Sequence, residues 1–374
     1  MRAEAQHRLD VVSEIPVVDL DRWSRSPADR DALAREVRDI CHHVGFLAVV
    51  NHGIPSRFLV SMFDMMARLF ALPEPQKRLI DKHRSRHFRG WEAVGAERTN
   101  NRPDMREQVD LWSEHPARAA DVEPPYLRLL GPNQWLTDDI APGFESLSRE
   151  WFDRAGALAS TLLSVMSRGL GLSDGYINDL FGHETMSLTK LIRYPATPPG
   201  AAGVNAHHDT GFLTVLAPGP TPGLEIQNAA GHWFPAQHVD GSLIINLGEM
   251  LQGMTGKYFV ATAHRVITTE ERYSMAYFHG PSLDMRNELL PLDRSYFTAV
   301  AASPRHSGAG FMARKFETEA GIGDMASAYK PSVYGEQLWN YFERSYPTIM
   351  RRHYGRAAEA SRPTVGASDN GAAT

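Results

Sequence analysis

A chain of 374 residues with 43% hydrophobic and 22% charged residues has the composition of an ordinary globular protein. Its formal net charge of −5 gives no general basic footprint, so we expect no nucleic acid partner. No run of about 18 apolar residues is present that could span a membrane, and the polar first residues lack the apolar core of a secretory signal. The single cysteine, Cys41, excludes an intramolecular disulfide framework and fits a reducing cytosol. We therefore expect a cytoplasmic protein.

The first half of the chain combines short strands with amphipathic helices. Strands are predicted at residues 15–20 and 45–50, and helical spacing of apolar residues predicts helices at 29–41 and after Ser56, the expected N-cap. The longest helical pattern runs from residue 143 to 170, with apolar residues every three or four positions. These helices are expected to pack against a sheet and to carry no chemistry.

Beyond residue 187 the chain becomes rich in β-forming residues broken by Pro and Gly. Strands are predicted at residues 188–194, 212–216, 224–227, 243–247, 266–268 and 273–278, with a final helix at 334–346 that packs back on the N-terminal helices. Many short strands with such breaks predict a mainly β fold with helical flanks and a jelly-roll core. We expect one domain over residues 1–355, divided near 185 and 285 into N-terminal, jelly-roll and C-terminal regions, and a disordered tail at 356–374 that is poor in large apolar residues.

A candidate metal site begins with His207 and Asp209. Residues i and i+2 of a strand point to the same side, so these two can meet one ion while His208 points away. The pair His238 and Asp240 has the same spacing, but it is followed at once by Gly241-Ser242 and is expected to lie in a turn. We therefore prefer the first pair.

The remaining ligand and an anion anchor are predicted downstream. His264 opens a strand that is expected to return as a hairpin into Arg272-Tyr273-Ser274, where Arg272 and Ser274 share a face. Two imidazoles with one carboxylate favour Fe(II), with zinc in a hydrolase as the alternative. A guanidinium beside a hydroxyl suits a carboxylate ligand, whereas a structural salt bridge is the simpler explanation of Arg272 alone.

Two other segments invite a functional interpretation. Cys41-His42-His43 resembles a metal motif, although a small buried residue near a helix end explains Cys41 more simply. Residues 83–91 are locally basic and aromatic, and Arg89 and Trp91 are candidates to receive a carboxylate-bearing substrate. The alternative is a solvated loop, because basic and acidic residues nearly balance over residues 81–118.

Taken in order, these motifs resemble the isopenicillin-N-synthase-like branch of the 2-oxoglutarate and Fe(II)-dependent oxygenases. The resemblance covers nearly the whole chain and rests on Gly45–Ile54, Leu191–Pro195, His207 with Asp209, Ile244–Glu249, His264-Arg265-Val266 and Arg272-Tyr273-Ser274. It implies a double-stranded β-helix with iron bound by His207, Asp209 and His264. It also implies that Arg272 and Ser274 hold the distal carboxylate of 2-oxoglutarate, with Tyr194 as a further polar contact.

The resemblance implies a dioxygenase that uses Fe(II), 2-oxoglutarate and O2 and releases succinate and CO2. The expected reaction is hydroxylation of a small molecule, with desaturation or cyclisation as further outcomes. Family members that use no 2-oxoglutarate also keep an Arg-x-Ser, so an iron oxidase without this cosubstrate is one alternative. Residues 251–256 and 276–281 resemble the bacterial ethylene-forming enzyme, which is a second alternative, although Ser274 departs from the residue expected there. A catalytically silent binding protein is the competing class, and such a protein is expected to have lost a ligand or the Arg-x-Ser.

Overall fold

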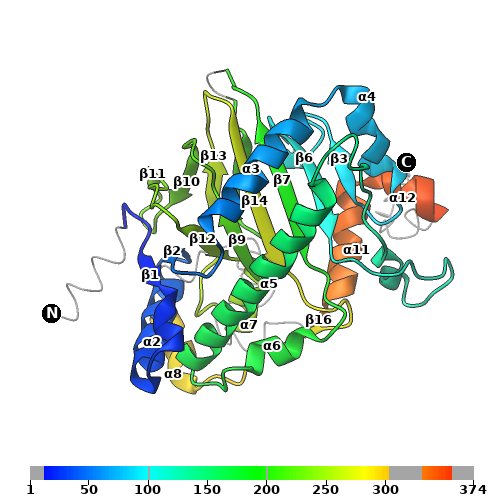
Figure 1. The fold of residues 1–374 in the computed structure, drawn as a ribbon. Helices are drawn as coiled ribbons and strands as arrows, with labels where there is room; N and C mark the ends of the chain where they lie inside the picture. Colours follow the sequence, from blue (N-terminus) through cyan, green and yellow to red (C-terminus); the bar gives the residue numbers. More distant parts are fainter. Residues whose placement is uncertain (1–11, 100–101, 199–200, 303–330, 356–374) are drawn as a thin grey trace, which may run out of the picture.

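The core is built from two β-sheets that face each other, as the jelly-roll prediction requires (Figure 1). The computed structural model describes residues 12–99, 102–198, 201–302 and 331–355. The predicted disordered tail at 356–374 lies outside these residues. Among the described residues, no helix is both long and apolar enough to cross a membrane.

The large sheet has eight strands in the order β1 (Val17–Asp19), β2 (Phe46–Val50), β12 (Leu243–Leu247), β9 (Leu213–Ala217), β14 (Arg272–His279), β7 (Leu188–Tyr194), β6 (Glu107–Trp112) and β3 (Gly90–Glu92). The small sheet has the order β11 (Trp233–Pro235), β10 (Leu224–Gln227), β13 (His264–Val266) and β8 (Val204–His207). Two short ribbons pair β4 (Arg98–Thr99) with β5 (Arg102–Pro103) and β15 (Arg286–Asn287) with β16 (Ser332–Val333). Four strands of the large sheet therefore come from the N-terminal half of the chain, where β3 and β6 were not predicted.

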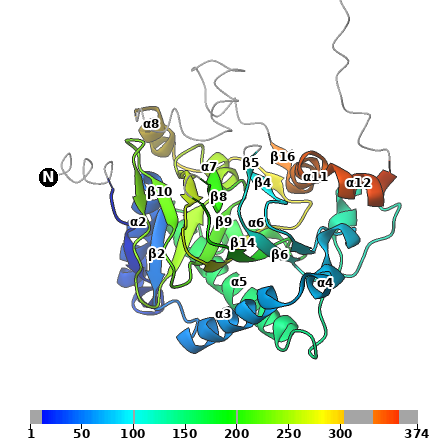
Figure 2. The ribbon, with the colours of Figure 1, turned by 90° about the horizontal axis from the view of Figure 1, so that it is seen from above.

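The helices lie outside the two sheets (Figure 2). They are α2 (Pro27–His43), α3 (Ser56–Ala71), α4 (Glu74–Lys77), α5 (Phe144–Gly169), α6 (Tyr176–Phe181), α7 (Glu249–Met254), α8 (Arg294–Ala302), α11 (Tyr334–Ser345) and α12 (Pro347–Tyr354), with 3-10 turns η1 (Leu20–Ser24), η2 (Arg78–Ile80), η3 (Lys82–Arg84) and η4 (Pro125–Leu129). Helix α2 begins at a capping box formed by Ser26 and Asp29. Helix α3 begins at Ser56 itself with Pro55 at the cap position, so the predicted Ser56 N-cap is wrong by one residue.

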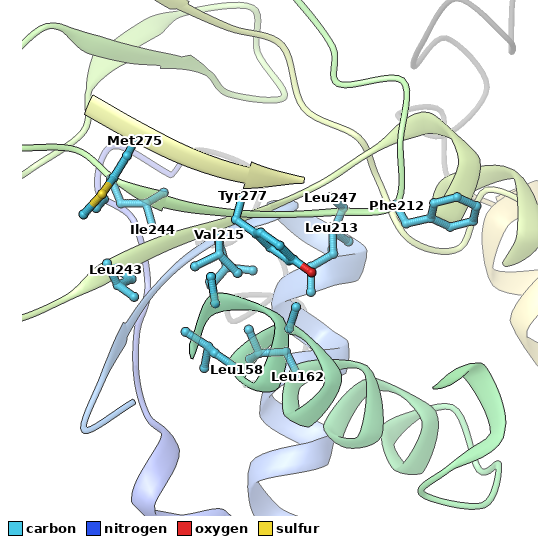
Figure 3. Close-up of a cluster of buried hydrophobic side chains, with 14 of the residues drawn as sticks. Leu158, Leu162, Phe212, Leu213, Val215, Leu243, Ile244, Leu247, Met275 and Tyr277 are labelled. Atoms are coloured by element: carbon cyan, nitrogen blue, oxygen red, sulfur yellow. The ribbon is translucent and has the colours of Figure 1, made fainter. Parts of the chain in front are cut away.

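Helix α5 covers the outer face of the large sheet. Its residues Leu158 and Leu162 point at side chains of β9, β12 and β14, among them Leu213, Val215 and Tyr277 (Figure 3). These residues are at most 5% exposed, and burying each leucine contributes about 1.5–3 kcal/mol relative to an exposed position. Because side chains alternate along a strand, Thr214, Asn246 and Ser274 point to the opposite side, which we call the inner face.

The C-terminal helix α11 packs on η4 and on the segment before β3, not on the N-terminal helices as expected. Phe342 stacks on Phe88 with ring centroids 3.9 Å apart, and Leu338, Trp339 and Phe342 are buried. This placement closes the end of the molecule beside β3 and β6.

Candidate metal centre

Three side chains of the small sheet and its adjoining turn form a compact donor group. His207 ends β8 and His264 begins β13, and the two are direct partners in the antiparallel ladder. Their Nε2 atoms each lie 3.6 Å from Oδ1 of Asp209. The donor atoms of the three residues all lie within 4.8 Å of one another, so one ion could contact all three.

Backbone carbonyls orient both imidazoles. Nδ1 of His207 lies 2.9 Å from the carbonyl oxygen of Asn205, and Nδ1 of His264 lies 3.1 Å from that of Thr262. Because a carbonyl only accepts, each Nδ1 carries the proton and each Nε2 presents its lone pair to the centre of the group. Such a hydrogen bond on the far ring nitrogen is the usual support of a metal-binding histidine.

The Asp209 carboxylate is held in a similar way through its other oxygen. Oδ2 accepts from Oγ1 of Thr214 at 2.5 Å and from Nδ2 of Asn246 at 2.7 Å. Thr214 and Asn246 are direct partners across β9 and β12, so the large sheet aims Oδ1 at the two imidazoles. The triad thus bridges the two sheets.

The charge states suit a divalent cation. Burial opposes ionisation of Asp209, but His207, His264 and Thr214 hold its pKa well below the ordinary value. Burial, together with the nearby His207, lowers the pKa of His264 to about 4. Burial opposes protonation of His207 as well, yet the Asp209 carboxylate raises its pKa. Two imidazoles and one ionised carboxylate on one side of a buried site are the donor set of non-haem Fe(II).

The predicted reason for the His-x-Asp spacing was only partly correct. Asp209 lies beyond the end of β8 rather than on the same strand, and hydrogen bonds from the large sheet, not strand alternation, direct its carboxylate. The alternative pair, His238 and Asp240, is exposed, and the two residues form an ion pair of 3.1 Å with each other. Cys41 is buried in α2, and burial raises the pKa of its thiol.

The predicted anion anchor lies on the inner face of the large sheet. Arg272 and Tyr194 are direct partners across β14 and β7, and the Arg272 guanidinium carbon lies 4.9 Å from the Tyr194 ring centroid. Oγ of Ser274 lies 3.5 Å from the Tyr194 hydroxyl. Arg272 is 1% exposed, its Nε donates to the carbonyl of Thr221, and its Nη1 has no partner among the described residues. Burial lowers the pKa of this guanidinium, and no carboxylate of the described residues pairs with it.

The predicted hairpin between His264 and Ser274 is not formed. Strand β13 pairs with β8 and β10 in the small sheet, whereas β14 pairs with β7 and β9 in the large sheet. Consecutive strands of a double-stranded β-helix alternate between its sheets, and this alternation puts His264 and Arg272 on opposite walls of one interior.

The two substrate candidates lie in the wall of the molecule and do not form part of the triad. Arg89 is fully buried, donates to backbone carbonyls of His87 and Leu129, and lies 5.9 Å from the ring centroid of Trp112. Trp91 is 3% exposed, and its indole Nε1 donates to Glu107 at 3.0 Å. Trp91 pairs with Val109 and therefore points to the outer face. The segment is packed rather than solvated at these positions.

Sequence reasoning missed the residues that support the triad. Thr214 and Asn246 lie in predicted strands, and only their alternation with the apolar outer-face residues on either side could have indicated that they point inward. Asp104, which is fully buried, accepts from both the backbone nitrogen and Nδ2 of Asn205. No local pattern marks that residue, because the contact spans about a hundred positions of the chain.

Comparison with known proteins agrees with this site. Residues 15–138 match the family described as non-haem dioxygenase in morphine synthesis, N-terminal, and residues 185–281 match the 2OG-Fe(II) oxygenase superfamily. The chain is 30% identical over 291 residues to the 2-oxoglutarate-dependent dioxygenase frbJ of Dothideomycetidae sp. (strain 11243), covering 75% of this chain and 78% of that protein. It is 32% identical over 268 residues to a 2-oxoglutarate-dependent dioxygenase of Gibberella zeae, covering 70% of each chain.

A solved structure shows the same fold. Neurospora crassa T7H in complex with alpha-KG and thymine superposes with a TM-score of 0.69 at 22% identity, covering 89% of this chain and 97% of that one. The chain therefore belongs to the 2OG-Fe(II) oxygenase superfamily. The predictions of the jelly-roll fold, of a 2-oxoglutarate-dependent dioxygenase and of Fe(II), 2-oxoglutarate and O2 as its requirements are confirmed.

Proposed function

We propose that His207, Asp209 and His264 bind Fe(II), and that Arg272, Ser274 and Tyr194 bind the distal carboxylate of 2-oxoglutarate. The observation that carries the proposal is the Nη1 atom of the fully buried Arg272, which has no partner among the described residues. It lies on the same inner face as the two residues that hold Asp209. A buried guanidinium without a counterion is costly unless a ligand carboxylate completes it. The outcome we favour is hydroxylation of a small molecule, with desaturation or cyclisation as variants, releasing succinate and CO2.

The iron, when bound with 2-oxoglutarate, supplies the activation of O2 and the oxidative decarboxylation. The chain's own residues position the reactants. Asp209 stays ionised because Thr214 and Asn246 donate to it, and the Nδ1 hydrogen bonds keep both imidazoles aligned for ligation. Arg272, Tyr194 and Ser274 fix the far end of the cosubstrate, and their burial keeps water from competing for the guanidinium.

Four alternatives compete with this assignment. An ethylene-forming enzyme of this fold would release ethylene from 2-oxoglutarate. An iron oxidase would bind no 2-oxoglutarate, and its Arg-x-Ser would serve another carboxylate. A silent binding member or a zinc hydrolase would leave the buried Arg272 without a role, which disfavours both.

The test loads the protein with Fe(II) under argon and titrates 2-oxoglutarate, following the visible charge-transfer band of the chelate. We expect the band in the wild type and its loss in His207→Ala, while His238→Ala, a matched exposed histidine, keeps it. Iron binding without a band would contradict the cosubstrate assignment. Iron binding lost in His238→Ala but retained in His207→Ala would contradict the ligand assignment.

We further infer a single domain over residues 1–355 and a role in secondary metabolism within the cytosol. Both family matches and the sheet that combines strands from both halves of the chain support one domain. The single buried cysteine supports a reducing compartment.

Of the two substrate candidates we keep Arg89, whose guanidinium lies against the inner-face residue Trp112. Trp91, on the outer face, is better explained by its bond to Glu107.

A further inference from the structure

The inner face continues from the triad across the large sheet to β6 and β3. Strand register carries one row of side chains from Ala276 on β14 to Lys190 on β7, and from Lys190 to Asp110 on β6. The next row holds Ser274, Ile192 and Gln108. Directly paired residues of neighbouring strands point to the same side. Lys190, Asp110 and Gln108 therefore share a surface with the anion anchor.

This surface carries a buried cluster of charged side chains, which we call the inner polar cluster. Nζ of Lys82 contacts Glu92 and lies 2.7 Å from Asp110, and Nζ of Lys190 lies 3.2 Å from both Glu97 and Asp110. Arg106 lies 2.7 Å from Glu97 and 3.5 Å from Asp104. The cations of the cluster are Lys82, Lys190 and Arg106, and its carboxylates are Glu92, Glu97, Asp104 and Asp110. Four carboxylates against three cations leave one negative charge in excess.

Two acceptors of the cluster have no partner among the described residues. They are Oδ1 of Asp110 and Oε1 of Gln108, on residues that are 3% and 1% exposed. The two residues are two positions apart on β6, so both side chains project to the inner face. A network that served only to hold the fold would satisfy such acceptors, because buried polar groups are nearly always hydrogen-bonded. We therefore expect these two acceptor oxygens to bind a hydrogen-bond donor from outside the described chain.

A chain of contacts links the inner polar cluster to the triad. Arg106 lies beside Asp104, Asp104 accepts from Asn205, and the Asn205 carbonyl lies 2.9 Å from Nδ1 of His207. Nε of Arg106 is a third buried atom without a partner in the described chain, and it would take an acceptor of the same ligand. The cluster is thus continuous with the proposed iron site.

We propose that the inner polar cluster is the substrate-recognition surface, and that the substrate carries a cationic N–H-rich group, such as an ammonium or amidinium, bound by Asp110 and Gln108. The excess negative charge selects a cation, and the two acceptors require donors on it. The inference rests on the proposed function, because the cluster lies on the wall that faces the triad.

Probes of matched shape and different charge test this assignment. Benzamidine, benzamide and benzoate are titrated by calorimetry into the Fe(II)- and 2-oxoglutarate-loaded protein under argon, with the chelate band followed in parallel. We expect benzamidine to bind with a Kd about tenfold or more below that of benzoate, because desolvated charge complementarity discriminates strongly. We expect it also to perturb the band. Equal affinity, the reverse order or no binding by any probe overturns the proposal.

Variants on the two faces of β6 separate recognition from stability. Asp110→Asn removes the excess charge. Gln108→Met removes an acceptor, together with the hydrogen bond from Gln108 Nε2 to Glu92, and keeps every carboxylate that pairs with a lysine. Each should reduce the preference for benzamidine by about tenfold. Glu107→Gln changes a buried carboxylate on the outer face, paired with Lys77 and Arg193, and should leave the preference unchanged. A preference that survives in both Asp110→Asn and Gln108→Met overturns the proposal. A missing chelate band with an intact benzamidine preference would instead contradict the cosubstrate assignment alone.

Discussion

Arg272 and Tyr194 face each other directly across β14 and β7, with the guanidinium 4.9 Å from the ring centroid and Nη1 free of any partner in the described chain. The ring fixes one side of the guanidinium plane, and the Tyr194 and Ser274 hydroxyls stand beside it. A cation held in this way is organised for a ligand carboxylate before the ligand arrives.

Arg272→Gln should therefore raise the Kd for 2-oxoglutarate roughly 10- to 100-fold, because it removes charge-assisted hydrogen bonds in a buried site. Titration of the chelate band or calorimetry measures the change. Arg193→Gln is the matched control, since Arg193 neighbours Tyr194 on β7 but pairs with Glu107 and Glu271 on the outer face. An unchanged Kd in Arg272→Gln would show that another group holds the cosubstrate.

Asn246→Ala should lower Fe(II) affinity by about 10- to 100-fold, since it removes one of the two donors that orient Asp209. Competition with a chromophoric chelator gives the affinity. The control variant, Asn287→Ala, also removes a buried asparagine side chain. Asn287 donates a hydrogen bond to Gln337 and makes no contact with the triad. That control should cost stability and leave the metal affinity at its wild-type value. If both variants bind iron equally well, the hydrogen bond to Asp209 has no positioning role.

Asp104→Ala should weaken Fe(II) binding less than Asn246→Ala does, by roughly a few-fold to tenfold, because Asp104 contacts no proposed ligand directly and reaches His207 through Asn205. Without Asp104, the His207 imidazole should be less well oriented. We therefore expect broadened visible absorption bands in the Co(II)-substituted Asp104→Ala protein. Asp104→Asn keeps one acceptor oxygen for Asn205 and should recover most of the affinity. Identical Co(II) spectra for the wild type and Asp104→Ala would rule out this relay.

Acid should destabilise the protein through His279, a buried histidine that lies outside the metal centre. Burial lowers its pKa to about 4 from an ordinary 6.5, while its ring stacks on Phe181 and contacts the Tyr277 hydroxyl. Above pH 6.5 neither the folded nor the unfolded state binds a proton at this site, so the contribution to stability is complete. Between pH 6.5 and 4 only the unfolded state gains the proton, and about 3 kcal/mol is lost.

Chemical denaturation of the wild type and His279→Gln between pH 8 and 4 measures how the free energy of unfolding changes on acidification. The variant should lose less stability on acidification than the wild type does, whatever its stability at pH 8. His183→Gln, which changes an exposed histidine, should follow the wild-type curve. A His279→Gln curve parallel to that of the wild type would show that His279 does not titrate abnormally.

The sequence by itself determined the elements and the chemistry that depends on residue type and local spacing. Apolar periodicity predicted α5 and α11 nearly to their ends, and alternation with Pro and Gly breaks predicted β7 and β10 at their observed bounds. The order of His207, Asp209, His264 and Arg272 predicted an oxygenase, because few functions need two imidazoles, a carboxylate and a guanidinium in that arrangement.

Only the tertiary structure decided how these residues meet. Strand pairing put β13 and β14 in different sheets, so His264 and Arg272 lie on opposite walls instead of on one hairpin. Asp209 lies beyond the end of β8, and its carboxylate is oriented by hydrogen bonds from Thr214 and Asn246. Asp110 shares a face with Arg272 because of the register of β6, β7 and β14. Such relationships join positions tens to hundreds of residues apart, and local patterns do not encode the register that sets them.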